Sequence, residues 1–354
     1  MIGAGNIAQV AVLPAFANAK DNSELVAVIS GDVSKRAALR ERYGFEIDGD
    51  YDALEAIIER GAIDAVYIAT PNSHHKTFAL RAARAGVHVL CEKPLAPSVD
   101  DCRAIIDACH AFEVKLMVGY RLHFDEATLR AMALAHSGKL GDVRLFSSVF
   151  THVVRAGDIR RDPSVAGGAS YDLGVYCINA ARHLFDAEPI QVIADAVFQE
   201  GADDTLSAIL RFPEGRLAQF CVSNSVAGVS SYRIAGTEGE LRVEPAYEYV
   251  EELVHHLTID DDTKRTTFKR GDQFAPELKY FSDCILNDRE PEPSGEEGWC
   301  DMRVVEALLV SARTRQPVEL PGYVRPQRPS PSQSDHEPPI KKPKPIAAPS
   351  PSVK

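Results

Sequence analysis

Short apolar runs alternate with helical patterns through the first part of the chain. The apolar runs cover residues 25–29, 65–69, 87–90 and 114–118. The helical patterns cover residues 34–42, 75–85 and 99–112. Strands that are apolar on both faces, with helices between them, are typical of a parallel sheet wound by right-handed crossovers. The pattern therefore predicts a doubly wound α/β domain.

After about residue 121 the pattern changes to strands joined by short turns. The expected strands cover residues 143–153, 190–198, 206–212, 217–226, 232–235 and 257–259. The pairs Glu214-Gly215 and Glu238-Gly239 are turn signals between such runs. One helix is expected over residues 171–185, and two more over 277–286 and 301–314. We therefore expect a second, α+β domain with a large, mainly antiparallel open sheet and helices on one face.

The end of the chain is rich in proline. Half of the 22 prolines lie between Pro317 and Pro351, interleaved with Ser, Lys and Gln. Such a segment buries too little apolar surface to offset the entropy of ordering it. We expect an extended or disordered tail, part of which could lie on a neighbour in polyproline II form. The predicted domains are thus a nucleotide-binding domain over 1–120, a substrate-binding and oligomerisation domain over 121–316, and the tail over 317–354.

Composition narrows the classes of function. The 39 Lys and Arg against 51 Asp and Glu make a net charge of −12, which argues against nucleic acid as the main partner. No apolar run approaches the ~20 residues that span a bilayer, and no basic segment precedes an apolar one near Met1. We expect no membrane partner and a cytoplasmic protein, or a periplasmic one if the natural chain starts earlier.

Cysteine and histidine spacing gives no support for a metal site. The seven cysteines include no CxxC pair, so a disulfide framework and structural zinc both fit poorly. His255 and His256 are adjacent in a region that reads as strand, so they would point to opposite faces. We predict no metal.

Residues 3–8, with the sequence GAGNIA, match the dinucleotide-binding pattern G-x-G-x-x-G/A at the start of a helix. Gly3 permits the tight turn, and Gly5 lets the main chain approach a pyrophosphate. The helix N-terminus, with Asn6 and Ile7, faces the phosphates. The strand–helix alternation that follows makes this short motif specific and indicates a Rossmann domain. Only two residues precede Gly3, where a strand of about five or six residues belongs, so the first strand is expected to be truncated.

The tip of the second strand indicates which nicotinamide cofactor is bound. NAD sites usually place an acid there to bind the ribose 2′-hydroxyl. Here the tip carries Ser30 and Gly31, with Lys35 and Arg36 on the following turn. A small hydroxyl and nearby cations suit a 2′-phosphate, so NADP is favoured over NAD. Asp32 leaves NAD open as the alternative, and the two cations could equally be surface helix charges.

Glu92, Lys93 and Pro94 follow directly after the apolar run at 87–90. The carboxyl edge of a parallel sheet is where ligands bind in this architecture. A lysine at that edge, close to a nicotinamide, is a candidate proton relay partner or hydroxyl anchor.

Several motifs together resemble the Gfo/Idh/MocA oxidoreductase family. In the first domain they are residues 3–8, the segment TPNSHH at 70–75, and Glu92-Lys93-Pro94. In the second domain, GGASYDLGVY at 167–176 resembles the substrate-domain signature of the family. The resemblance extends to about residue 321. Residues 119–124, the Ser30-Gly31 tip and residues 176–182 place it nearest the branch of glucose–fructose oxidoreductase and NADP-dependent sugar (D-xylose, dihydrodiol) dehydrogenases.

The resemblance implies hydride transfer between nicotinamide and a sugar carbon, C1 of an aldose in this branch. Tyr176, at the position of the family's frequent histidine, would give or take the hydroxyl proton. Lys93 would bind the same oxygen, and Asp172 would bind sugar hydroxyls. Asp172 and Tyr176 are four residues apart, so on one helix they would share a face, whereas Tyr171 would serve packing. The implied cofactor contacts are Gly3, Gly5, Asn6, Ile7, Ser30, Gly31, Lys35, Arg36, Thr70, Pro71, Asn72, His75, Glu92, Lys93 and Arg121.

Two other functions stay open at this point. One is a non-catalytic NADP-binding regulator or sensor, which would not need Lys93, Asp172 and Tyr176 together. The other is a dihydrodiol or inositol-type dehydrogenase of the same family. We expect a small sugar or polyol as substrate. The resemblance also implies that the open face of the second sheet makes a homodimer or homotetramer contact.

Overall fold

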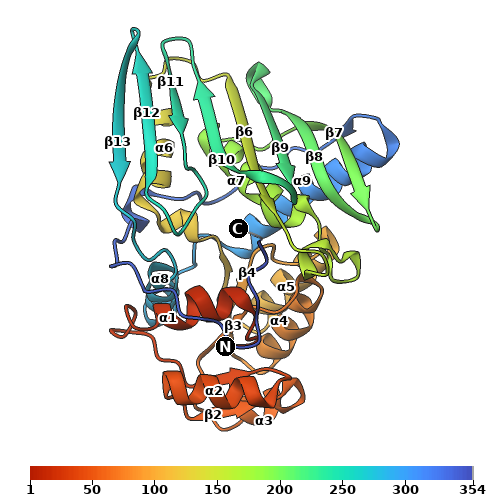
Figure 1. The fold of residues 1–354 in the computed structure, drawn as a ribbon, viewed down its shortest axis with the longest axis vertical. Helices are drawn as coiled ribbons and strands as arrows, with labels where there is room; N and C mark the ends of the chain where they lie inside the picture. Colours follow the sequence, from red (N-terminus) through yellow and green to blue (C-terminus); the bar gives the residue numbers. More distant parts are fainter. Residues whose placement is uncertain (353–354) are drawn as a thin grey trace. The chain divides into compact units, whose positions relative to one another are not determined.

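In the computed structural model, which describes residues 1–352, the apolar runs of the first 120 residues form parallel strands as predicted (Figure 1). The strands are β1 (Ala27–Ile29), β2 (Ile47–Gly49), β3 (Ala65–Ile68), β4 (His88–Glu92) and β5 (Leu116–Gly119). Strand β1 pairs with β2, and β4 lies between β3 and β5, each pair in parallel. The helices around them are η1 (Ala8–Val12), α1 (Leu13–Ala15), α2 (Val33–Tyr43), α3 (Leu54–Ile58), α4 (His75–Arg84), α5 (Val99–Ala111) and α8 (Ala275–Leu286).

Ile2 occupies the place of the first strand. It forms isolated parallel bridges with Ile29 and Ile68 and is fully buried. The Ile2 amide donates to the Tyr67 carbonyl over 2.8 Å, and the Ala69 amide donates to the Ile2 carbonyl over 2.8 Å. Ile2 thus connects, within the described residues, the two halves of the parallel sheet.

The second part of the chain contains the predicted large sheet. Its order is β13-β12-β11-β10-β6-β9-β8-β7-β14, and every neighbouring pair is antiparallel except β6 with β9. The strands are β6 (Leu145–Val153), β7 (Gln191–Gln199), β8 (Ala202–Arg211), β9 (Leu217–Ser223), β10 (Ser225–Ala235), β11 (Gly239–Val243), β12 (Leu253–Ile259), β13 (Asp262–Phe268) and β14 (Val318–Glu319). Helices α6 (Glu126–His136), α7 (Val175–Leu184) and α9 (Gly295–Thr314) cover one face (Figure 1). Apolar side chains such as Leu145, Val197 and Ile209 are exposed on this sheet.

Several elements differ from the sequence expectation, and strands β2, β11, β13 and β14 and helix α3 were not predicted. The apolar stretch at 217–226 is two strands rather than one, because the chain changes partners at the buried residue Asn224. The Asn224 amide donates to Asp204 and its carbonyl accepts from Val154, each over 2.8 Å. Helix α6 was not predicted, although Asp125 caps it by accepting from the Thr128 amide.

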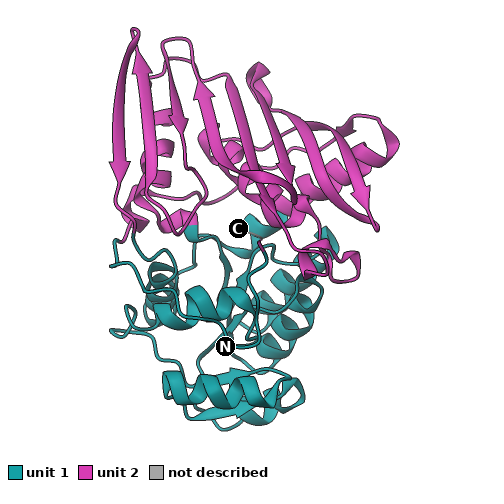
Figure 2. Cartoon of the chain, in the orientation of Figure 1, with its two compact units in different colours: residues 1–121, 271–299, 336–351 teal, residues 122–270, 300–335, 352–354 magenta. Residues whose placement is uncertain are grey.

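Contacts divide the chain into two units, and each unit joins separate stretches of sequence (Figure 2). Unit 1 consists of residues 1–121, 271–299 and 336–351, and unit 2 of residues 122–270, 300–335 and 352. The nucleotide-binding unit therefore includes helix α8 and residues 336–351 of the proline-rich tail, whereas residues 317–335 of the tail belong to unit 2. The predicted boundaries placed α8 in the second domain and the tail in neither.

Residues 336–351 of the tail pack within unit 1. The Gln9 side chain bonds both main-chain groups of Ile346, over 3.0 and 2.7 Å. Asn6 donates to the carbonyls of Ala348 and Pro349, over 3.0 and 3.2 Å. Ile346 also packs on the apolar cluster formed by Ala4, Leu13, Val28, Leu39 and Phe45. The side chains of Asn6 and Gln9 thus hold residues 346–349 mainly through hydrogen bonds to the main chain of the tail.

A chain that ends at Asp335 should be less stable than the full chain. Truncation removes the hydrogen bonds of the tail and the burial of Ile346. We expect this loss of stabilising free energy to exceed the entropy gain of the missing tail by ~1–2 kcal/mol. Urea unfolding curves measure this as a lower midpoint. The Lys341→Ala, Lys342→Ala double variant is the control, because both side chains are exposed. An unchanged midpoint after truncation would show that the docked tail contributes no net stability.

Candidate active site

The close approach of neighbouring main chain decides which residues fit in the glycine-rich turn. Gly3 has φ +92°, and a Cβ there would lie 2.5 Å from the Ala69 carbonyl oxygen, so only glycine fits. A Cβ at Gly5 would meet only that same oxygen, at 4.0 Å. Gly5 therefore leaves open space beside the main chain, as the approach of a pyrophosphate requires. The π-helix η1 begins at Ala8, directly after Ile7.

At the tip of β1, Asp32 has a structural role. Its carboxylate accepts from the Lys35 amide over 2.9 Å and caps helix α2. The Tyr51 hydroxyl bonds the Ser30 side chain and the Gly31 main chain, and burial raises the pKa of Tyr51. Sequence reasoning missed Tyr51, whose signal is its place just after the carboxyl end of β2. The tip is thus formed by a small hydroxyl, a glycine and a tyrosine ring.

The two predicted cations at this tip differ in their surroundings. Arg36 is buried and pairs with Asp48, Nε to Oδ2, over 3.0 Å. It also donates to the Ser30 carbonyl. Arg36 therefore stabilises the main chain at the tip, through the Ser30 carbonyl. Lys35 is half-buried and remains the more accessible of the two cations.

The segment after β3 is tied to the segment after β4 by His75. This buried ring contacts the Pro94 carbonyl through Nδ1 over 2.9 Å and the Thr70 carbonyl through Nε2 over 3.0 Å. Burial lowers the pKa of His75, although both carbonyls favour its protonated form. His75 thus positions the main chain around Pro71 and Asn72.

The carboxyl ends of β3, β4 and β5 bring the remaining unit 1 candidates together. Glu92 accepts from the Tyr67 hydroxyl over 2.8 Å and from the Lys93 amide over 3.3 Å. Burial raises the pKa of Glu92, and the Tyr67 hydroxyl opposes that effect. Arg121, just after β5, is buried and donates to Gln273. Lys93 therefore stands where the three parallel strands end.

In unit 2, Asp172 lies in a π-helix rather than in the expected α-helix. This segment, η7 (Ser170–Gly174), leads directly into α7, and π-helical turns often mark functional sites. The Asp172 carboxylate pairs with Arg160 Nε over 3.1 Å and lies 3.6 Å from His152 Nε2. Sequence reasoning missed both partners, which come from the loop after β6 and from β6 itself.

Tyr176, in the first turn of α7, is held by aromatic rings. The Phe150 ring meets it edge to face at 5.6 Å between centroids, and the Tyr247 ring lies at 6.0 Å. Tyr247 is itself anchored by a 2.7 Å contact between its hydroxyl and Ser148 Oγ. These contacts fix the direction of the Tyr176 ring.

The glycine pair of the signature has a clear packing reason. Gly168 has φ +155°, and a Cβ there would lie 2.2 Å from Asp203 Oδ1. Asp203 accepts from the Ser170 amide over 2.7 Å and from its hydroxyl over 3.0 Å. Burial raises the pKa of Asp203 to about 6. Asp203 therefore holds the start of η7.

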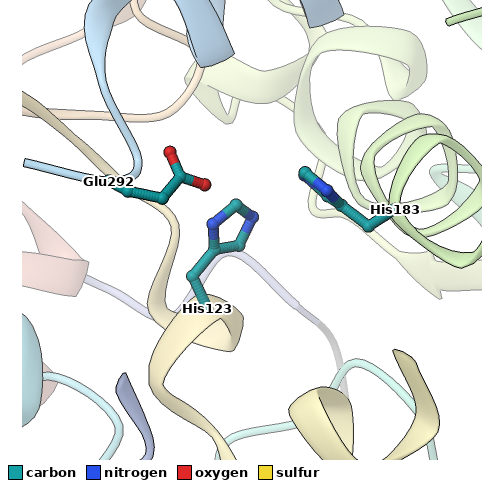
Figure 3. Close-up of side chains that lie close together, drawn as sticks. All are labelled: His123, His183 and Glu292. Atoms are coloured by element: carbon teal, nitrogen blue, oxygen red, sulfur yellow. The ribbon is translucent and has the colours of Figure 1, made fainter. Parts of the chain in front are cut away.

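The segment at 176–182 leads to a buried polar network. Arg182 is fully buried and pairs with Glu188 and Asp301. Beside it, the rings of His123 and His183 pack edge to face with centroids 4.9 Å apart (Figure 3). Glu292, which Figure 3 also draws, belongs to unit 1.

Among the helices of the described chain, none combines the length and apolar character needed to cross a membrane.

Comparisons with known proteins agree with this geometry. Residues 1–120 match a family model described as "Oxidoreductase family, NAD-binding Rossmann fold". Residues 128–242 match the "GFO/IDH/MocA C-terminal domain".

Two curated relatives and two solved structures are similar over most of the chain. A D-xylose 1-dehydrogenase (NADP(+)) of Haloferax volcanii is 33% identical over 326 residues, covering 90% of this chain and 98% of the relative. Its counterpart from Haloarcula marismortui is 31% identical, covering 90% and 92%. The aldose-aldose oxidoreductase of Caulobacter crescentus, solved with glycerol, is 34% identical with a TM-score of 0.86, covering 90% and 98%. A 3-ketoreductase of Actinomadura kijaniata, solved with NADP and TDP-benzene, is 27% identical with a TM-score of 0.80, covering 88% and 96%.

Proposed function

Because the chain belongs to the Gfo/Idh/MocA oxidoreductase family, we propose that it is an NADP-dependent oxidoreductase that acts on the C1 hydroxyl or carbonyl of an aldose. One observation carries this proposal. Lys93 follows directly after β4 in the nucleotide-binding unit. Asp172 lies in η7 and Tyr176 in the first turn of α7, in a chain whose relatives are NADP-dependent sugar dehydrogenases. A non-catalytic sensor would need none of these three side chains.

Each residue has a defined part in sugar oxidation. When bound, NADP would supply the nicotinamide that accepts a hydride from C1. Tyr176 takes the proton of the C1 hydroxyl, and Lys93 binds the same oxygen. Asp172 accepts hydrogen bonds from sugar hydroxyls, with its carboxylate oriented by Arg160. In the reducing direction the same groups return the proton.

The tip of β1 supports NADP rather than NAD. Asp32 is engaged as a helix cap, so it is not directed at a ribose hydroxyl. Ser30, Gly31 and the half-buried Lys35 leave a small polar surface beside one cation for a 2′-phosphate. Arg36 contributes from beneath, through the Ser30 carbonyl.

NADPH should stabilise the protein more than NADH does. At a concentration of 100 times Kd, a ligand adds about 2.7 kcal/mol to the free energy of unfolding, which a thermal unfolding curve detects easily. The Asp32→Ser variant is the matched control, since serine also caps helices, and it should keep the same preference. Equal shifts with both cofactors, or a loss of the NADH shift in this variant alone, would contradict the NADP assignment.

The substrate class is tested by reducing NADP⁺ with a panel of purified polyols. We expect aldoses such as D-xylose and D-glucose to be oxidised to lactones. The panel should include an inositol and a trans-dihydrodiol, because an inositol 2-dehydrogenase of Rhizobium meliloti and a mouse dihydrodiol dehydrogenase are also similar, at 27% and 26% identity. Turnover of either one in preference to every aldose would replace the sugar assignment.

The open face of the large sheet supports a homodimer or homotetramer. Exposed apolar side chains on its strands, including Leu145, Val197 and Ile209, are the kind of surface that self-association buries.

The described cysteines are all free thiols, which fits the reducing cytoplasm. The acidic net charge of −12 disfavours a nucleic-acid partner.

A further inference from the structure

Glu277 is a buried carboxyl group that the proposed reaction does not use. It lies in the first turn of α8 and is fully buried. Within the described chain, neither of its carboxyl oxygens has a hydrogen-bond partner. An isolated buried carboxylate is costly, so such a group takes up a proton instead. Burial accordingly raises the pKa of Glu277 well above its ordinary value, and the nearby charge of Glu92 raises it further.

The groups around Glu277 come from the carboxyl ends of the parallel strands. Besides Glu92, the charged groups that act on it are Arg121 and Asp272. Arg121 is bonded to Gln273, four residues before Glu277, so the start of α8 lies against the chain that follows β5. The charges of Glu92 and Glu277 both raise the pKa of Tyr67, after burial, which is the largest cause. Helix α8 thus brings a second carboxyl group to the end of the sheet that bears Lys93.

The hydrogen bonds differ sharply between the two carboxyl groups. Glu92 accepts from the Tyr67 hydroxyl and from the Lys93 amide, and such donors favour the ionised form. Glu277 has no donor. Two neighbouring carboxylates repel each other, so one of the pair holds a proton. The geometry places that proton on Glu277 and the negative charge on Glu92.

We propose that Glu277 is a positioning residue for the proton transfer served by Lys93: by remaining protonated, it leaves Glu92 as the single carboxylate that orients the Glu92-Lys93-Pro94 segment. This role rests on the proposed function, since Lys93 needs a reaction to serve. At alkaline pH, ionisation of Glu277 adds a second negative charge beside Glu92. That charge opposes proton release through this region and lowers kcat for sugar oxidation.

The location of the proton is tested by infrared spectroscopy of the full chain. The wild type should show the C=O stretch of a protonated carboxyl group at neutral pH. The Glu277→Gln variant should lose this band, and the Glu92→Gln variant should keep it. A band that survives Glu277→Gln, or that disappears only in Glu92→Gln, overturns the proposal. This readout needs no substrate, so it is independent of whether an aldose is turned over.

The positioning role is tested by the pH profile of kcat. The neutral amide of Glu277→Gln mimics the protonated acid, so most of the wild-type kcat at neutral pH should remain. Its kcat should stay high about one pH unit further into the alkaline range, the size of effect that a nearby like charge produces. An unchanged profile refutes the role even if the infrared result holds.

A second variant keeps the proposal testable if Glu277→Gln fails to fold. Tyr67→Phe removes a donor from Glu92 and leaves Glu277 intact. The proton should then be shared more evenly, and the infrared band should shift. An unmoved band in Tyr67→Phe overturns the proposed division of charge between the two carboxyl groups.

Discussion

Tyr176→Phe should lower kcat by about 10²–10⁴-fold, the usual contribution of a general acid or base. The substitution removes only the hydroxyl group. The phenyl ring keeps its packing against Phe150 and Tyr247, so the fold of α7 should be unchanged. The Kd for NADPH, measured by fluorescence, should match that of the wild type, because Tyr176 and the glycine-rich turn belong to different units.

The matched control for this experiment is Tyr171→Phe. Tyr171 lies in the π-helix η7, and burial raises its pKa to about 12. It is assigned a packing role, so loss of its hydroxyl should leave kcat close to the wild-type value. Near-normal turnover in Tyr176→Phe, with the control equally active, would refute Tyr176 as the acid/base.

Arg182→Met should destabilise the protein by about 3–5 kcal/mol, the cost of breaking a buried ion pair by removing one partner. Arg182 is fully buried, and its Nε lies 2.6 Å from Glu188 Oε2. It also pairs with Asp301, which is completely buried as well. Methionine fills much of the space but removes the Arg182 charge from buried Asp301 and leaves Glu188 with only the 3.5 Å contact to Arg328. Urea unfolding curves measure the loss.

An exposed ion pair provides the control for Arg182. Arg289 pairs with Asp283 at the surface, where the two side chains are 51% and 48% exposed. Arg289→Met should therefore cost less than about 1 kcal/mol. A loss of that small size in Arg182→Met would mean that water or rearrangement compensates the buried carboxylates.

Much of the nucleotide-binding unit could be predicted because its signals are local. Helix α2 lies between the cap Asp32 and Gly44 in the left-handed region, and extends the predicted span of 34–42 by one residue at each end. The apolar stretch at 217–226 was read as one strand because hydrophobic period does not register a change of strand partner. That change depends on Asn224 and its bonds to Asp204 and Val154.

The candidate site divides in the same way. The glycine-rich turn and the Glu92-Lys93-Pro94 segment each consist of adjacent residues, so a motif identifies them. Tyr51, Arg160 and Glu277 carry no such motif. They join the site because strands end side by side or because a helix packs against a distant part of the chain.

The sequence alone determined the class of fold, the family and the residues on which the chemistry is proposed, because periodicity, turn chemistry and short motifs are properties of neighbours along the chain. The tertiary structure alone decided what several of those residues do. Asp32 became a helix cap, Arg36 a buried support and His75 a link between two loops. Burial and charge state depend on groups that folding brings together, and the effect of the Glu92 charge on the pKa of Glu277 is an example. A pattern of neighbouring residues along the chain does not predict such long-range contacts.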